Sequence, residues 1–122
     1  MAAVVAWFEV PSKDFARSVQ FYGTILGKPL ATGEFMGVPH GFFQNTAGES
    51  QGAVIQSATA VPAPNGPLLY LHVDSDLAGV VERVAPAGGE VVTPVTSIGE
   101  QGSIAVIRDT ESNQIGLHTP LT

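Results

Sequence analysis

The sequence predicts an α+β protein built from two tandem βαβββ repeats. Two observations predict this class. Each half of the chain contains strand-like and helix-like segments in the same order, and two aspartates that can start helices, Asp14 and Asp76, lie 62 residues apart. The chain has 122 residues, of which 44% are hydrophobic, which suffices for one core but not for two independent domains. We therefore expect one domain over residues 1–122, with repeats at about 1–60 and 66–122.

Two amphipathic helices are predicted, over residues 14–26 and 76–87. In each segment apolar residues recur at helical spacing after an aspartate that can act as the N-cap. Gly27 ends the first helix, and a Gly-Gly pair follows the second. An internal glycine and a late proline weaken the helical pattern of the second segment.

Each helix follows one strand-like segment and precedes three more, which are separated by Gly, Asn or Pro. A single βαβββ unit leaves one sheet face and one edge uncovered, so two units are expected to pack together. The Pro-rich segment 61–67 is the predicted linker. The predicted strands are residues 4–10, 29–35, 41–44 and 53–57 in the first repeat, and 68–73, 90–96, 103–108 and 114–118 in the second.

Composition argues against several classes of partner. The net charge is −6, which does not suit binding to nucleic acid or to an anionic membrane. No apolar run is long enough for a membrane helix, and the first residues lack a positively charged region, so we expect a cytoplasmic protein. The chain has no cysteine, which excludes disulfides, thiolate metal sites and a thiol nucleophile. No phosphate-binding loop or nucleophile-elbow motif is present.

Two segments carry a family resemblance. Residues 14–27 read DFARSVQFYGTILG, and residues 109–117 read DTESNQIGL. The first is similar to the D-x-x-R-S-x-x-F-Y-x-x-x-L-G helix, and the second to the D-P-x-G-N-x-I-E-L turn and strand, of the glyoxalase/bleomycin-resistance/extradiol-dioxygenase (vicinal oxygen chelate) superfamily. The resemblance spans nearly the whole chain and implies sheets that form an open, half-barrel-like cleft. It implies the fold more firmly than the function.

Enzymes of this superfamily usually hold a divalent metal in the cleft, with His, Glu or Gln ligands from the first and last strand of each repeat. The resemblance places Trp7 and Leu68 at the two first-strand positions, and Gln56 and Gly116 at the two last-strand positions. Only Gln56 can act as a ligand, and a single protein ligand does not hold a divalent ion. We therefore expect no metal cofactor, with a metal-dependent glyoxalase or dioxygenase as the less favoured alternative.

Alternation along the strands places further side chains on the face that carries the family's ligands. Glu9 shares that face with Trp7, Tyr70 and His72 share it with Leu68, and His118 shares it with Gly116. The set Glu9, His72 and His118 has the composition of a two-His-one-carboxylate metal site, although its members lie at different distances from the vacated positions. The predicted ligand-binding residues are Trp7, Glu9, Gln56, Tyr70, His72 and His118.

Each of these residues also has a structural interpretation. The two histidines His72 and His118 suit strand ends, where backbone or water satisfies them. The aromatic side chains Trp7 and Tyr70 can fill core space, and Glu9 can lie at a rim or in an ion pair. His40 is expected in a hairpin turn, exposed to solvent.

Two functions follow from these patterns. The first is a glyoxalase-like protein that binds a small organic molecule in the sheet cleft without a metal. The alternative is a metal-dependent or metal-free lyase, isomerase or dioxygenase that uses Glu9 and His118. The resemblance also implies a homodimer.

Overall fold

The computed structural model describes residues 4–121 and contains two βαβββ repeats. A short 3-10 helix, η1 (Gly99–Gln101), precedes β7. The predicted α+β class and the tandem repeat are confirmed. The first repeat comprises β1 (Phe8–Pro11), α1 (Phe15–Leu26), β2 (Ala31–Phe35), β3 (Val38–Gln44) and β4 (Ser50–Ile55). The second comprises β5 (Leu69–His72), α2 (Leu77–Glu82), β6 (Glu90–Ser97), β7 (Ser103–Arg108) and β8 (Gln114–Thr119).

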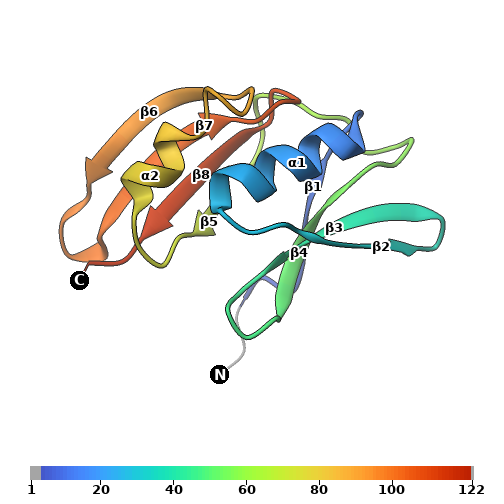
Figure 1. Ribbon diagram of the computed structural model, residues 1–122, viewed down its shortest axis with the longest axis horizontal. Helices are drawn as coiled ribbons and strands as arrows, with labels where there is room; N and C mark the ends of the chain where they lie inside the picture. Colours follow the sequence, from blue (N-terminus) through green and yellow to red (C-terminus); the bar gives the residue numbers. More distant parts are fainter. Residues whose placement is uncertain (1–3, 122) are drawn as a thin grey trace.

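Each repeat forms its own open four-stranded sheet with the same topology. The strand orders are β1-β4-β3-β2 and β5-β8-β7-β6. In both sheets the first and last strands of the repeat pair in parallel, and the other pairs are antiparallel. In Figure 1 the second sheet lies on the left with α2 across it, the first sheet lies at the lower right, and α1 lies between them.

Helix α1 has the ends that the sequence predicts. The Asp14 side chain accepts a hydrogen bond from the Arg17 backbone N–H, and Gly27 adopts the left-handed conformation with φ 75°. Only glycine takes this conformation without strain, so the chain turns sharply after Leu26. The buried residues of α1 lie on one face and include Phe21, Tyr22 and Ile25.

Several predicted limits differ from the observed ones, and helix α2 and strand β1 are the clearest cases. Helix α2 ends at Glu82, not at residue 87, and residues 83–88 form turns. Pro86 lacks a backbone N–H and disfavours helical geometry at the residue before it, so the helix cannot continue. Strand β1 begins at Phe8, whose partner is Gly52; residues 4–7 have no strand partner.

Side chains from both helices and from the inner faces of both sheets form one hydrophobic cluster. Tyr22, Ile25, Val84, Ile107 and Leu117 are fully buried in it. Such burial contributes roughly 1.5–3 kcal/mol for each large side chain. A single core therefore joins the two repeats.

A polar network also joins the repeats. The Tyr22 hydroxyl donates to the Asp109 carboxylate over 2.6 Å, and Asn113 donates to the Pro11 carbonyl over 2.8 Å. Asp109 and Asn113 both lie in the turn between β7 and β8, and their partners Tyr22 and Pro11 belong to the first repeat. Burial, followed by the nearby Asp109 charge and hydrogen bond, raises the pKa of Tyr22 well above its usual value.

The predicted linker, residues 61–67, runs between β4 and β5 without helix or strand. The Ala63 backbone N–H in this segment donates to the Asn113 side chain over 3.1 Å. Within residues 4–121, none of the helices has the length and apolar character needed to cross a membrane.

Candidate functional site

Each sheet has an inner face against the helices and an outer face that the helices leave uncovered. Register defines the outer faces. On the first sheet Glu9, Ala53 and Phe42 lie side by side, and His40 follows next to Ile55. On the second sheet Tyr70, Gly116 and Val106 occupy the corresponding row, with Ile104, His118 and His72 in the next. A hollow lies on each outer face, and the two hollows share no lining residue.

The first-sheet hollow has a volume of about 370 Å³. At its edge the Trp7 indole N–H donates to the Glu9 carboxylate over 3.3 Å. The Trp7 ring packs edge-on against the Phe42 ring, with 6.3 Å between the ring centroids. The hollow is lined by Glu9, Phe35, Met36, Val38, His40, Ile55, Ser57 and Thr59.

His40 corrects one expectation from the sequence. It does not lie in an exposed turn, because β3 begins at Val38 and carries His40 in its interior with only 5% of its surface exposed. Its ring stacks on Phe42 and meets Phe35 edge-on. The imidazole Nε2 lies 3.7 Å from the Glu9 carboxylate. The alternation of Val38, His40 and Phe42 was the sequence signal for this strand face.

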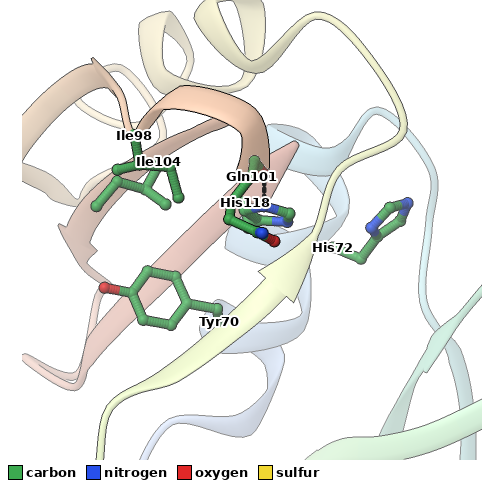
Figure 2. A pocket seen from close by; sticks show the side chains of 6 residues that line it. All are labelled: Tyr70, His72, Ile98, Gln101, Ile104 and His118. Carbon is green, nitrogen blue, oxygen red and sulfur yellow. Dashed lines mark hydrogen bonds between the residues drawn. The ribbon is translucent and has the colours of Figure 1, made fainter. Parts of the chain in front are cut away.

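The second-sheet hollow has a volume of about 560 Å³. Figure 2 shows Tyr70 directed toward Ile98 and Ile104, His118 beside Gln101, and His72 apart from the other side chains. The wall therefore combines an aromatic ring, aliphatic side chains and imidazoles. It contains three of the residues that the sequence singled out, Tyr70, His72 and His118.

Both histidines of this hollow have partners. The His118 Nε2 lies 2.6 Å from the Gln101 carbonyl, which can only accept, so this nitrogen carries the proton. The contact fixes η1 against β8 and leaves Nδ1 as an acceptor in the neutral ring. His72 pairs with Asp74 at 2.8 Å, and both side chains are exposed. The His118 contact is of the backbone kind that the strand-end interpretation gives, whereas His72 pairs with a carboxylate side chain.

The Tyr70 ring lies directly over Gly116. A Cβ at position 116 would come within 2.4 Å of the ring, which is too close for any side chain. Tyr70 pairs with Gly116 across the parallel β5–β8 ladder, so the backbone register brings the two together. The missing side chain lets the ring lie close to the strand backbone, although 44% of Tyr70 remains exposed.

Gln56 lies away from both hollows. Its side-chain oxygen accepts a hydrogen bond from the Phe15 backbone N–H over 2.9 Å, at the start of α1. Residues along a strand alternate between faces, and Gln56 follows Ile55 by one. The outer-face counterpart of Gly116 is Ala53, because Ala53 pairs with Glu9 as Gly116 pairs with Tyr70.

Comparison with known families assigns the fold. The sequence profile of the glyoxalase/bleomycin resistance protein/dioxygenase superfamily matches residues 4–117. The chain belongs to this superfamily. The resemblance in the first helix and the last turn is thereby confirmed.

Relatives within the superfamily are distant. "Putative glyoxylase CFP32" of Mycobacterium bovis (strain ATCC BAA-935 / AF2122/97) is 27% identical over 114 residues, which cover 91% of this chain and 43% of that protein. The chain thus spans less than half the length of this relative. A glyoxylase/bleomycin resistance protein/dioxygenase domain from Frankia sp. EAN1pec superposes with a TM-score of 0.72 at 22% identity, over 99% of this chain and 100% of that one. A glyoxalase/bleomycin resistance protein from Albidiferax ferrireducens T118 gives 0.72 at 18% identity, over 98% and 100%.

The residues that the resemblance places at the superfamily's metal-ligand positions do not suit a divalent ion. It places Trp7, Leu68 and Gly116 at three of these positions, and side chains of these types do not coordinate such an ion. The register places Ala53 at the fourth position, and Gln56 is engaged at the start of α1.

A relocated metal site from Glu9, His72 and His118 is not assembled either. Glu9 lines the first-sheet hollow, whereas the two histidines line the second-sheet hollow. Within residues 4–121, no three His, Cys, Asp or Glu side chains lie close enough to hold one ion. The acid–base pairing of Glu9 with His118 in one hollow is absent for the same reason, and His40 is the histidine beside Glu9.

Proposed function

We propose that this superfamily member binds a small organic molecule in the second-sheet hollow and does so without a metal ion. The observation that carries the proposal is the Tyr70 ring lying over Gly116 on an uncovered sheet face. A partly exposed aromatic ring provides a surface on which a planar group can stack.

Size and lining support the same function. A volume of about 560 Å³ lies within the range of small-molecule sites. Ile98 and Ile104 supply apolar contacts beside the ring, and the free Nδ1 of His118 can accept a hydrogen bond from the ligand. The names of related proteins, glyoxylase and bleomycin resistance protein, also refer to small organic molecules.

Thermal denaturation with a panel of aromatic and polycyclic compounds tests the proposal. A compound present at a hundred times its Kd should stabilise the protein by about 2.7 kcal/mol. The Tyr70→Ala variant should lose this stabilisation. The matched control, Phe35→Ala, removes an exposed ring from the other hollow and should retain it.

Two results would count against this function. One is a panel in which no compound raises Tm; the other is a Tyr70→Ala variant that binds as well as the original chain. Elemental analysis of the purified protein tests the proposal that binding needs no metal ion. A near-stoichiometric metal content would overturn that proposal.

We also propose that the protein forms a homodimer. Large apolar side chains are exposed on the outer side of both repeats, among them Trp7, Phe35, Val92 and Ile98. Exposed apolar clusters of this kind favour self-association. Light scattering after size-exclusion chromatography should give twice the monomer mass of 12.6 kDa; a monomer at all concentrations would contradict this.

A further inference from the structure

The first-sheet hollow contains a buried histidine with one ring nitrogen held by a backbone carbonyl. His40 Nδ1 lies 2.8 Å from the Val38 carbonyl. A carbonyl oxygen can only accept, so Nδ1 carries a proton, and the neutral ring presents the lone pair of Nε2. Stacking on Phe42 and the edge contact with Phe35 hold the ring in this orientation.

A second acceptor lies beside Nε2. The Glu9 carboxylate is 3.7 Å away, which is too far for a direct hydrogen bond. The same carboxylate oxygen accepts from the Trp7 indole N–H, which fixes its position at the edge of the hollow. With the ring neutral, two acceptors therefore lie 3.7 Å apart.

The electrostatics of this hollow favour a cation. Glu9 is the one charged residue among its lining side chains, and no Lys or Arg is among them. The three arginines of the chain are each bound to other groups, Arg17 to Glu111, Arg83 to the Ile25 carbonyl and Arg108 to Glu90. The chain as a whole carries a net charge of −6. Aromatic rings beside a carboxylate add cation–π attraction.

We propose that the first-sheet hollow is a separate binding site for an organic primary amine. The ammonium group has several N–H donors and can donate to His40 Nε2 and to the Glu9 carboxylate at once. The apolar body of the amine would pack against Phe35, Met36 and Ile55. The site shares no residue with the second-sheet hollow, so the two proposals stand or fall independently.

Trp7 offers a direct readout, because it is the single tryptophan of the chain and donates to Glu9. The probes are phenethylamine, phenylpropionate and phenethyl alcohol, which share an aromatic body and differ in the polar group. Phenethylamine should give a saturable change in tryptophan fluorescence, confirmed by calorimetry. The anionic phenylpropionate should give none, and the neutral alcohol should bind more weakly than the amine.

Variants separate the roles of the groups. Glu9→Gln should weaken phenethylamine binding about 10-fold or more, as expected for loss of a charge-assisted hydrogen bond. Glu34→Gln removes a carboxylate from the opposite face of the same sheet and should leave binding unchanged. His40→Gln keeps a neutral acceptor and should bind better than His40→Phe. Tyr70→Ala should leave phenethylamine binding intact, because Tyr70 belongs to the other hollow.

Three results would overturn the amine site. Phenylpropionate could bind as tightly as phenethylamine, which would mean that His40 is protonated and the hollow accepts anions. Phenethylamine could give no saturable signal. Phenethylamine could also bind equally well to Glu9→Gln and Glu34→Gln, which would mean that only the net charge of the protein affects binding. None of these results bears on compounds that depend on Tyr70.

Discussion

The turns between the last two strands of each repeat are built alike but placed differently. In the first, the Asn45 side chain accepts from the backbone N–H groups of Ala47 and Glu49. In the second, the Asp109 side chain accepts from those of Glu111 and Asn113. The fourth residue of each turn has positive φ, 81° at Gly48 and 67° at Ser112.

Their surroundings differ completely. Asn45 is exposed and contacts only its own turn, whereas Asp109 is 5% exposed and also binds the Tyr22 hydroxyl of the other repeat. The same local geometry thus closes a surface hairpin in one repeat and joins the two repeats in the other. Burial, not turn type, decides how much such a turn contributes to stability.

The outer faces show the same separation of position from chemistry. By register, Glu9 corresponds to Tyr70, and His40 corresponds to Ile104. Each repeat carries an imidazole beside its hollow, but on different strands, β3 in the first and β8 in the second. The two repeats therefore have equivalent backbones, but their different side chains form two different hollows.

Removing the side chain of each turn should give the largest contrast. Asp109→Ala leaves the buried Tyr22 hydroxyl and two turn N–H groups without their acceptor, and should lower the free energy of unfolding by about 4 kcal/mol. Asn45→Ala should cost about 1 kcal/mol or less, because water replaces the lost acceptor. Urea denaturation measures both. Equal costs would refute the role of burial; if Asp109→Ala does not fold, Tyr22→Phe tests the same contact.

A smaller effect on stability is expected at position 116, whose equivalent on the outer face of the first repeat is position 53. Gly116→Ala places a Cβ against the Tyr70 ring and should cost about 2 kcal/mol. The counterpart, Ala53, already carries a Cβ, and its partner on the parallel strand is Glu9 instead of an aromatic residue. In a Tyr70→Ala background the cost of Gly116→Ala should largely disappear. An unchanged cost in that background would show that the ring is not the source of the strain.

The smallest effect concerns acid stability. Desolvation opposes ionisation of Glu111, but hydrogen bonds from the Lys13 N–H, Arg17 and the Asp14 N–H outweigh it and lower the pKa of this carboxyl below its ordinary value. Its contribution to stability is present above the unfolded pKa and is lost as pH falls through the folded pKa. Glu111→Gln should therefore reduce the loss of stability between neutral and acidic pH. Glu49→Gln, in the exposed turn, is the control and should leave that loss in place.

Local signals in the sequence predicted the elements well. The aspartate caps, the glycine after α1 and the period-two strands depend on neighbours in the chain, and the structure has these elements in the predicted order. Strand limits depend on pairing, which the sequence does not show: β1 starts at Phe8, which pairs with Gly52, and residues 4–7 have no strand partner. Pro86, which limits α2, is also a local signal. Because it lies four residues after Glu82, it did not define the last residue of the helix.

The candidate site depended on contacts between distant residues, which the sequence does not reveal. Assigning Gln56 to the ligand face required the register of β4, and a shift of one residue changes the face. The burial of His40 depends on Phe35 and Phe42 on both sides of a hairpin. The six predicted residues are consequently divided between two hollows and the start of α1.

The parallel pairing of β1 with β4, and of β5 with β8, also constrains how the chain can fold during synthesis. In each repeat the first strand has no partner until the last strand has left the ribosome. Such pairings span nearly a whole repeat, and contacts of large sequence separation form slowly. The parallel strand pair of each sheet therefore forms late. The Tyr22 hydroxyl of the first repeat has its acceptor, Asp109, only after the second repeat has been synthesised as far as that residue. The nascent first repeat therefore exposes apolar surface until the second repeat has been synthesised, the stage at which a chaperone would bind it.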